Sequence, residues 1–471
     1  MGANLLWKKS AKELITLLKS KSISPIEALT ANLDRINETH EDINAVITLC
    51  EERALKKIKE LQADAPDLPG YLHGLPILIK DLTEVKGVKT TFGSKIYENN
   101  ISKHSDFLVE KIEKMGGIVL GKTNTPEFGA GSNTFNEIFG ITANPWNTAY
   151  TAGGSSGGTA AALASGAAWL GTGSDLGGSL RNPASFCGVV GLRPTIGTVA
   201  HGPTNLPFND LSVDGPMARN VEDISLFLDT MSGLDARDPL SSKKTNISFQ
   251  EAIYSEKSKL NIGITDDYNM LACHPEVRET IHHAEKILIK MGHNVSRTCP
   301  DFSHAEETFQ ILRAHLLASG KKSLYESHKD TLKEDLRLNI EKGINLETKD
   351  IDKANILRGE IVNNTNLFFE EFDILIAPSS MVPPFNKNIL WPQQVENKIF
   401  DNYVSWLMTA ATISLTGCPA LAVPCNFNDE SLPIGIQIIG QRRNEALILN
   451  LGYHFEKFTN NSNLTPINPI K

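Results

Sequence analysis

The sequence has few cysteines, and they form no metal-binding or redox pattern. Six cysteines are scattered through 471 residues, no Cys-x-x-Cys pair occurs, and no His-Glu-x-x-His segment is present. Clustered Cys and His ligands are the usual signature of a zinc site, so we expect no metal. Scattered cysteines without pairing motifs are typical of reduced, mostly buried thiols in a cytosolic protein.

Long apolar runs and basic blocks are also missing. No apolar stretch approaches the ~20 residues of a transmembrane helix. The first 15 residues show no signal-peptide core, and Leu6 stands where a myristoylation motif needs Ser or Thr. The net charge is −9, which argues against a nucleic-acid partner. We therefore expect a cytoplasmic globular protein that binds neither membranes nor nucleic acid.

Histidine is absent from the part of the chain richest in serine and glycine. Tyr150–Ser185 contains six serines and nine glycines but no histidine, whereas serine hydrolases usually pair the nucleophile with a histidine. Gly154–Gly158 matches the G-x-S-x-G nucleophile elbow. An elbow follows an apolar strand, however, and Asn144–Gly153 does not look like one. A histidine-based triad is therefore not predicted.

Two further glycine-containing segments resemble nucleotide-binding motifs in residue pattern but lack features that those motifs require. Gly116–Thr123 fits the phosphate-loop pattern, but Ile118–Leu120 in its middle is strand-like and Pro126 falls in the helix that should follow. Gly171–Gly178 lacks the third glycine of a dinucleotide fingerprint. Neither segment predicts a nucleotide cofactor.

The order of elements predicts one α/β domain. Ser-x-x-Glu capping boxes at Ser10 and Ser24 begin two N-terminal helices, and the apolar run in Gly74–Asp81 is typical of a buried strand. Further short strands alternate with helices, and residues 301–372 are mostly helical and charged. We predict a single large domain over residues 1–471, with a mixed central β-sheet covered by helices on both faces.

Two glycine clusters in Tyr150–Ser185 contain serines and are joined by one predicted helix. Dense glycine indicates either tight turns or a close approach of the backbone to another group. In Asp175–Ser179, successive N–H groups can turn toward one point, as an oxyanion hole requires. A lysine can replace histidine as the base if burial lowers its pKa from ~10.4 toward ~7–8. Lys80 ends an apolar run, where a surface role and a buried role both remain open.

Six segments match one known family in the same order. They are HGLPILIKD (73–81), GKTNTPEFG (121–129), NPWN…TAGGSSGG (144–158), GSDLGGSLRNPASFCGVVGLRPT (173–195), DGPMARNVED (214–223) and TGCPALAVPCNF…LPIGIQIIG (416–440). By these segments the sequence resembles the amidase signature family over nearly the whole chain. The resemblance implies the amidase signature fold, with a signature core at about 70–235 and a variable section at about 301–372. It also implies an amidase that needs no cofactor.

The resemblance implies a Ser–cis-Ser–Lys triad. Ser179 in DLGGS would be the nucleophile, Ser155 in GGSSGG the middle member and Lys80 in PILIKD the base. The Gly154–Ser155 peptide bond would be cis. Neutral Lys80 would take a proton from Ser155, which takes one from Ser179 as that serine attacks the amide carbonyl and forms an acyl-enzyme. The expected oxyanion hole consists of the backbone N–H groups of Leu176, Gly177, Gly178 and Ser179.

Other residues near these segments have more than one interpretation. Asp175 and Arg181 flank the expected nucleophile, and they either orient its loop or pair at the surface. Ser156 either bonds to Lys80 or caps the following helix. Gly129 lies where family members line the substrate pocket with backbone.

The resemblance leaves two functions open. One is hydrolysis of a small-molecule amide by a stand-alone amidase. The alternative is the glutaminase (A) subunit of a tRNA-dependent amidotransferase. That subunit has a Tyr- and Arg-rich segment in its second half, and the equivalent region here, Leu336–Asn364, lacks this pattern. The subunit also has an acidic residue at the position where Leu407 stands in this chain. We therefore expect a stand-alone amidase. Phe400–Gly417 either lines a pocket for an apolar or aryl acyl group or packs in the core. The sequence does not give the oligomeric state, and a homodimer is possible.

Overall fold

A computed structural model describes residues 3–61, 66–244, 247–256 and 259–471, and a mixed β-sheet of eleven strands forms its centre. In order across the sheet the strands are β1 (Val46–Leu49), β3 (Ile118–Thr123), β2 (Pro76–Lys80), β8 (Leu170–Asp175), β10 (Val213–Ala218), β9 (Val190–Arg193), β16 (Ala420–Phe427), β17 (Pro433–Gly440), β13 (Ile374–Pro378), β11 (Asn261–Ile264) and β12 (Asn294–Arg297). β2 pairs parallel with β3 and β8, and β11 pairs parallel with β12 and β13. All pairs from β8 to β13 are antiparallel. The predicted mixed sheet is confirmed.

Helices surround this sheet, and the two N-terminal ones begin as predicted. The α-helices are α1 (Ala11–Lys19), α2 (Pro25–Ile43), α3 (Glu51–Lys59), α4 (Phe107–Lys114), α5 (Gly157–Ala164), α6 (Arg181–Cys187), α7 (Val221–Met231), α8 (Phe249–Ala252), α9 (Pro275–Lys290), α10 (Ala305–His328), α11 (Glu334–Ile344), α12 (Thr348–Glu371), α13 (Met408–Thr416) and α14 (Glu445–Thr459). Ser10 and Ser24 form capping boxes with Glu13 and Glu27 at the starts of α1 and α2.

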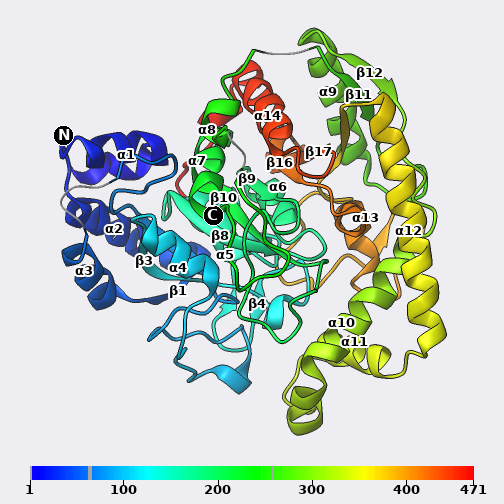
Figure 1. The fold of residues 1–471 in the computed structure, drawn as a ribbon, viewed down its shortest axis with the longest axis horizontal. Coiled ribbons are helices and arrows are strands. Elements are labelled where there is room, and N and C mark those ends of the chain that lie inside the picture. The colour runs from blue at the N-terminus through cyan, green and yellow to red at the C-terminus, as the bar shows by residue number, and fades with distance from the viewer. Residues whose placement is uncertain (1–2, 62–65, 245–246, 257–258) are drawn as a thin grey trace.

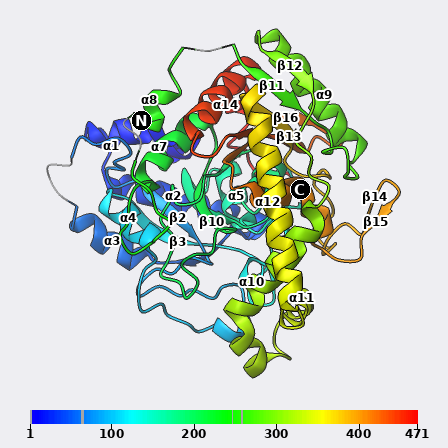
Figure 2. The ribbon, with the colours of Figure 1, turned by 45° about the vertical axis from the view of Figure 1, so that its right-hand side comes forward.

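Short elements connect the larger ones. Three two-stranded sheets pair β4 (Phe135–Asn136) with β5 (Gly140–Ile141), β6 (Ala143–Asn144) with β7 (Asn147–Thr151), and β14 (Gln394–Val395) with β15 (Lys398–Ile399). The 3-10 helices are η1 (Ala3–Lys8), η2 (Lys95–Tyr97), η3 (Glu127–Gly129), η4 (Ser405–Leu407) and η5 (Asn461–Asn463). Figure 2 shows the β14–β15 hairpin projecting from the body of the molecule.

Alternate side chains of β2 pack into two separate cores, one on each face of the sheet. Ile77 and Ile79 pack with residues of α1, α4 and α7, whereas Leu78 packs with residues of α2 and α5. Successive side chains of a strand point to opposite faces, so Lys80 shares the face of Leu78 and points toward α5. Helices therefore cover both faces, as predicted, and the strand pattern fixes the side on which Lys80 lies.

Helices α10, α11 and α12 lie on the opposite side of the molecule from α1–α4 (Figure 1). Helix α10 packs against both α11 and α12, and both α10 and α12 contact α13. Phe309 of α10 belongs to the same buried apolar cluster as Trp406 of η4 and Met408 of α13. This cluster also contains Leu375 of β13, so it joins α10 to the sheet. The two longest helices, α10 and α12, have 24 residues each. Within the described ranges, no helix combines the length and the apolar character needed to cross a membrane.

Candidate active site

Lys80 ends strand β2, and its ammonium group faces three serine hydroxyls. Lys80 Nζ lies 2.7 Å from Ser155 Oγ, 2.9 Å from Ser156 Oγ and 3.1 Å from Ser174 Oγ. The Lys80 side chain is fully buried. Every hydrogen-bond partner of its Nζ in the described part of the chain is thus a neutral hydroxyl.

Burial lowers the pKa of Lys80 from 10.5 to about 7. The cause is desolvation, because removing an ammonium group from water disfavours its charged form. The carboxylates of Asp214 and Asp175 raise this pKa, but they do not outweigh burial. Lys80 is therefore about half neutral at pH 7, and in its neutral form it can accept a proton from a hydroxyl.

The turn between β7 and α5 places Ser155 and Ser156 beside Lys80. The Gly154–Ser155 peptide bond is cis, as the resemblance implied. Ser156 is the N-cap residue of α5, but its side chain makes no capping hydrogen bond. It accepts from Lys80 instead, which decides between the two interpretations of Ser156. A Cβ on Gly173 would lie 2.8 Å from Ser156 Oγ, so glycine is needed there for β8 to approach this turn.

The carboxylate of Asp175 anchors the loop that contains Ser179. It accepts from Arg181 Nη2 at 2.9 Å and from the N–H of Gly178 at 2.8 Å, and Arg193 Nη1 lies 3.3 Å away. Asp175, Arg181 and Arg193 are fully buried. Burial alone would raise the pKa of Asp175, but Arg181 and Arg193 outweigh it and hold that pKa well below its usual range. The pair of Asp175 and Arg181 thus lies under the loop and not at the surface.

The N–H groups of this loop are not all free. Gly178 donates its N–H to Asp175 Oδ1, which corrects the expectation that all four N–H groups face an oxyanion. Asp175 lies directly before the loop, and its carboxylate already accepts the hydrogen bond of the Gly178 N–H. The N–H groups of Leu176, Gly177 and Ser179 donate to no acceptor within the described ranges. Gly178 has φ +114°, a backbone conformation that favours glycine, so its role here is to turn the chain.

A cavity of about 100 Å³ opens beside Ser155 and Ser179. Its apolar lining consists of Leu82, Phe128, Ala130, Leu176, Phe309, Leu317 and Leu407. Gly129 also lines it, with φ +70°, and a Cβ at that position would lie 2.8 Å from Leu82 Cδ1 and 3.3 Å from Ser155 Oγ. The expected position of Gly129 in the pocket wall agrees with this geometry. Apolar side chains from Phe400–Gly417 both line the cavity, as Leu407 does, and pack in the core, as Trp406 does.

The three residues expected to form a triad meet at this cavity from different segments. Lys80 comes from β2, Ser155 from the turn before α5, and Ser179 from the loop before α6. Ser155 and the half-buried Ser179 both line the cavity, and the N–H of Ser156 donates to the Ser179 carbonyl at 3.2 Å. A hydrogen bond joins Lys80 to Ser155. In the parts of the chain that are described, none joins the two hydroxyls of Ser155 and Ser179.

Sequence reasoning missed four polar residues of the site, of which Ser212 lines the cavity directly before β10. Ser174 directly precedes Asp175 in the signature segment, and its place at the end of β8 was a signal that could have found it. Arg313 and Tyr403 also line the cavity. They come from α10 and from the loop before η4, where no motif marks a site.

The motif-like segments rejected above have structural roles. Gly116–Thr123 ends in β3, where the buried Lys122 pairs with Asp81 at 3.0 Å and donates to the Thr83 carbonyl at 2.8 Å. Gly154–Gly158 does follow a strand, β7, which was not expected. That strand belongs to a two-stranded sheet and not to the central one, so the setting of a nucleophile elbow is not met.

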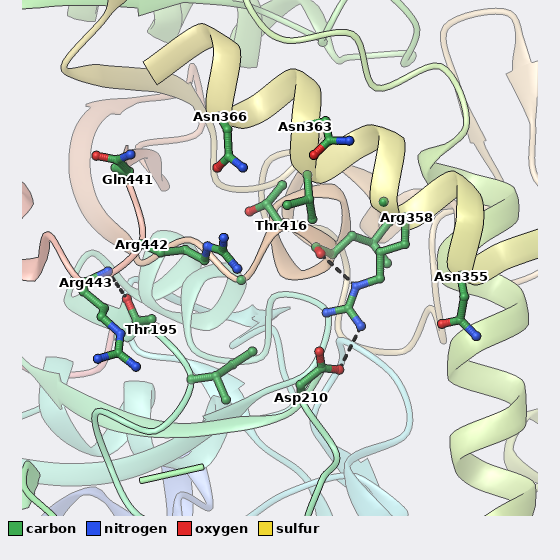
Figure 3. Close-up of a pocket in the computed structure, with 15 residues that line it drawn as sticks. Thr195, Asp210, Asn355, Arg358, Asn363, Asn366, Thr416, Gln441, Arg442 and Arg443 are labelled. Atoms are coloured by element: carbon green, nitrogen blue, oxygen red, sulfur yellow. Dashed lines mark hydrogen bonds and ion pairs between the residues drawn. The ribbon is translucent and has the colours of Figure 1, made fainter. Parts of the chain in front are cut away.

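A larger and strongly polar cavity of about 640 Å³ lies at the C-terminal end of α13 (Figure 3). Arg358 of α12 donates there to Asp210 Oδ1 at 2.8 Å and to the Leu415 carbonyl at 3.0 Å. Figure 3 shows Arg442 and Asn366 extending into the same space. None of the expected catalytic residues lines it. The smaller cavity beside Ser179 is therefore the candidate active site.

Known proteins resemble this chain over nearly its whole length. A family model described as Amidase matches residues 27–449. The chain is 34% identical to the glutamyl-tRNA(Gln) amidotransferase (A) subunit of Sulfurihydrogenibium sp. (strain YO3AOP1), with 96% of this chain and 97% of that protein covered. It is 32% identical to an acylamidase of Rhodococcus erythropolis, with 96% of each protein covered.

A solved structure has the same fold. A bacterial aryl acylamidase that belongs to the amidase signature enzymes matches this structure with a TM-score of 0.91 at 27% sequence identity. The match covers 98% of this chain and 99% of that one. The similarity therefore extends over the central sheet and its helices, well beyond the segment around the two serine clusters.

Proposed function

The chain belongs to the amidase signature family and is a hydrolase of amide C–N bonds, and from this premise we propose that Ser179 is its nucleophile, Ser155 its proton relay and Lys80 its base. The substrate class is a small-molecule carboxylic acid amide, cleaved to a carboxylate and ammonia or an amine. The observation that carries the proposal is the 2.7 Å contact between buried Lys80 and Ser155 at a cavity that also contains Ser179.

Acylation begins with proton transfer along the three residues. Neutral Lys80 takes a proton from Ser155 Oγ, and Ser155 takes one from Ser179 Oγ as that oxygen attacks the amide carbon. The Ser179 hydroxyl must turn toward Ser155 for this step. The carbonyl oxygen gains negative charge, and the free N–H groups of residues 176, 177 and 179 stabilise it.

The relay then runs in reverse to release the amine. Protonated Lys80 returns a proton through Ser155 to the leaving nitrogen, the C–N bond breaks, and the acyl group remains as an ester on Ser179. Water attacks this ester with the same base, and the carboxylate leaves. The buried ion pair of Asp175 and Arg181 keeps the loop in place through both steps.

The two sections of the chain contribute differently to the proposed site. The signature core, at about 70–235, supplies Lys80, Ser155 and Ser179. The section at about 301–372 supplies Phe309 and Leu317 of α10 to the cavity wall. We therefore assign catalysis to the first section and shaping of the acyl pocket to the second.

Serine substitutions test the assignment. Ser179→Ala should lower amide turnover by about 10⁴-fold or more, and Ser155→Ala by about 10²–10⁴-fold, on a panel of aliphatic, aryl and amino-acid amides. Ser165→Ala is the matched control, because Ser165 is buried at the end of α5 and donates to the Ala162 carbonyl; it should keep the wild-type rate. Near wild-type turnover in a folded Ser179→Ala variant would remove Ser179 as the nucleophile.

The glutaminase subunit of a tRNA-dependent amidotransferase is a second candidate, favoured by the 34% identity to such a subunit. Free glutamine would then be the substrate. None of the described residues that line the cavity is acidic, and Leu407 lines it, so the cavity has no carboxylate for the α-amino group. Glutaminase activity that appears only when partner subunits are added would favour this candidate and contradict a stand-alone amidase.

A further inference from the structure

The cavity beside Ser179 contains a buried cation. Arg313 of α10 lines it and is only 6% exposed, and it is the only charged residue among the described residues of the lining. Its guanidinium donates to Asn339 Oδ1 and to the hydroxyl of Tyr403. Both partners are neutral. The nearby Asp335 pairs with Lys333 at 3.4 Å, and no carboxylate within the described ranges forms an ion pair with Arg313.

A buried guanidinium without an anionic partner is an incomplete site. Removal of a charge from water is costly unless a counter-charge and hydrogen bonds replace the solvent. Arginine has five N–H donors in a planar fork that fits a carboxylate through two parallel hydrogen bonds. The guanidinium also lies over the ring of Tyr403, 5.1 Å from the ring centroid, and such a cation–π contact offsets part of its charge. The remaining donors of the fork still have no anionic partner within the described ranges. Because Arg313 lines the cavity, a bound ligand can supply the missing anion.

We propose that Arg313 binds a carboxylate on the acyl part of the substrate, so that the chain hydrolyses monoamides of dicarboxylic acids. This inference rests on the function proposed above. In a primary amide the leaving group is ammonia, so a carboxylate in the cavity belongs to the acyl part. The apolar walls at Phe309 and Leu317 suit the methylene groups that join the amide to the carboxylate.

The same lining disfavours a substrate that also carries an ammonium group, because its hydroxyl groups, such as that of Ser212, are neutral and none of its described residues is acidic. Leu407 and the other apolar side chains offer no acceptor, and an unpaired ammonium in an apolar wall is disfavoured. An ammonium near Arg313 would also meet a like charge. The structure therefore favours glutaramate, which is glutamine without its α-amino group, over L-glutamine itself.

Three substrates that differ by one group test the inference. Glutaramate has the carboxylate, butyramide lacks it, and L-glutamine adds the ammonium group. Ammonia release from each gives kcat/KM, and succinamate and adipamate vary the length of the acyl chain. The wild-type chain should hydrolyse the best of the three dicarboxylic monoamides at least about 100-fold better than butyramide or L-glutamine.

Variants of Arg313 separate substrate binding from a structural role. Arg313→Met should lower kcat/KM for the carboxylate substrate by about 100-fold, while the value for butyramide changes less than about threefold. Arg313→Lys should fall between the two, because it keeps the charge and loses the fork. Arg442→Met is the matched control, since Arg442 is exposed and lies outside this cavity; it should leave both values unchanged.

Each contrary result has a distinct meaning. Equal loss on both substrates in Arg313→Met would show that Arg313 only braces Asn339 and Tyr403, and it would overturn the inference. The inference would also be overturned if the wild-type chain cleaved butyramide at the same rate as every dicarboxylic monoamide. It would likewise be overturned if the chain cleaved no dicarboxylic monoamide although a fluorophosphonate labels Ser179. In these cases the nucleophile assignment survives. No labelling of Ser179 and no cleavage of any amide would instead contradict the proposed function.

Discussion

The pH dependence of amide hydrolysis should report the pKa of Lys80. The base must be neutral to take a proton, and burial places its pKa at about 7. At two pH units below that value, only about 1% of Lys80 is neutral. We therefore expect kcat/KM to fall about tenfold per pH unit below 7, so that the value at pH 5 is about 100-fold below the plateau reached near pH 9.

Removal of one nearby carboxylate should move this midpoint in a known direction. The charge of Asp214 raises the pKa of Lys80, so Asp214→Asn should lower that pKa and shift the acid limb to lower pH. Asp214 also contacts His201 Nδ1 at 2.7 Å. His201→Gln is therefore the control: it removes this partner and keeps the carboxylate, so it should not lower the midpoint.

The assay is kcat/KM for a neutral amide between pH 5 and pH 9 at constant ionic strength. A neutral substrate ensures that the midpoint belongs to the protein. A flat profile over this range would refute the reasoning, as would a midpoint near pH 10, the value of an exposed lysine. A midpoint that Asp214→Asn moves upward would contradict the electrostatic part.

Three further predictions concern stability and the cavity wall. The folded pKa of Lys80, about 7, lies below the unfolded value of ~10.4. Between these values the unfolded chain binds an extra proton, so stability rises with pH across that window. In urea titrations, Lys80→Met should therefore raise the free energy of unfolding by roughly 1–4 kcal/mol at pH 7, with a smaller gain at pH 9.5. Asp175→Asn should lower it by roughly 3–5 kcal/mol, because two buried arginines lose their counter-charge; an unchanged urea midpoint would contradict this. Gly129→Ala should reduce kcat/KM by about 10-fold or more, because the new Cβ would press on Leu82 and Ser155. Gly131→Ala should reduce kcat/KM less, because a Cβ at that position would meet only Lys333 Nζ, at 3.5 Å. Equal losses in the two variants would point to backbone strain alone.

The strands, and the segments whose residues meet at the cavity, could be predicted because their signals are local. The apolar run before Lys80 marks a strand buried on both faces, and its alternation fixes the side on which Lys80 lies. The capping boxes of α1 and α2 are equally local. The distances between Lys80 and its serines depend on how β2, β8 and α5 pack, which no segment encodes alone.

Features that depend on tertiary contacts could not be predicted. Arg313 lies in a charged helix without a motif, and it reaches the cavity because α10 packs against α13. The loss of Gly178 N–H from the expected oxyanion hole depends on the carboxylate of Asp175, which the sequence offered either as a loop anchor or as a surface group. In both cases the partner, and not the residue type, decides the role.

The identity of the nucleophile is tested most directly by active-site labelling. A fluorophosphonate should add once to the wild-type chain, and mass spectrometry of the peptides should place the adduct on Ser179. Labelling should be lost in Ser179→Ala and be strongly slowed in Lys80→Met and Ser155→Ala, because the relay no longer activates the nucleophile. An adduct on Ser155 or Ser156, or labelling that persists in Ser179→Ala, would contradict the account.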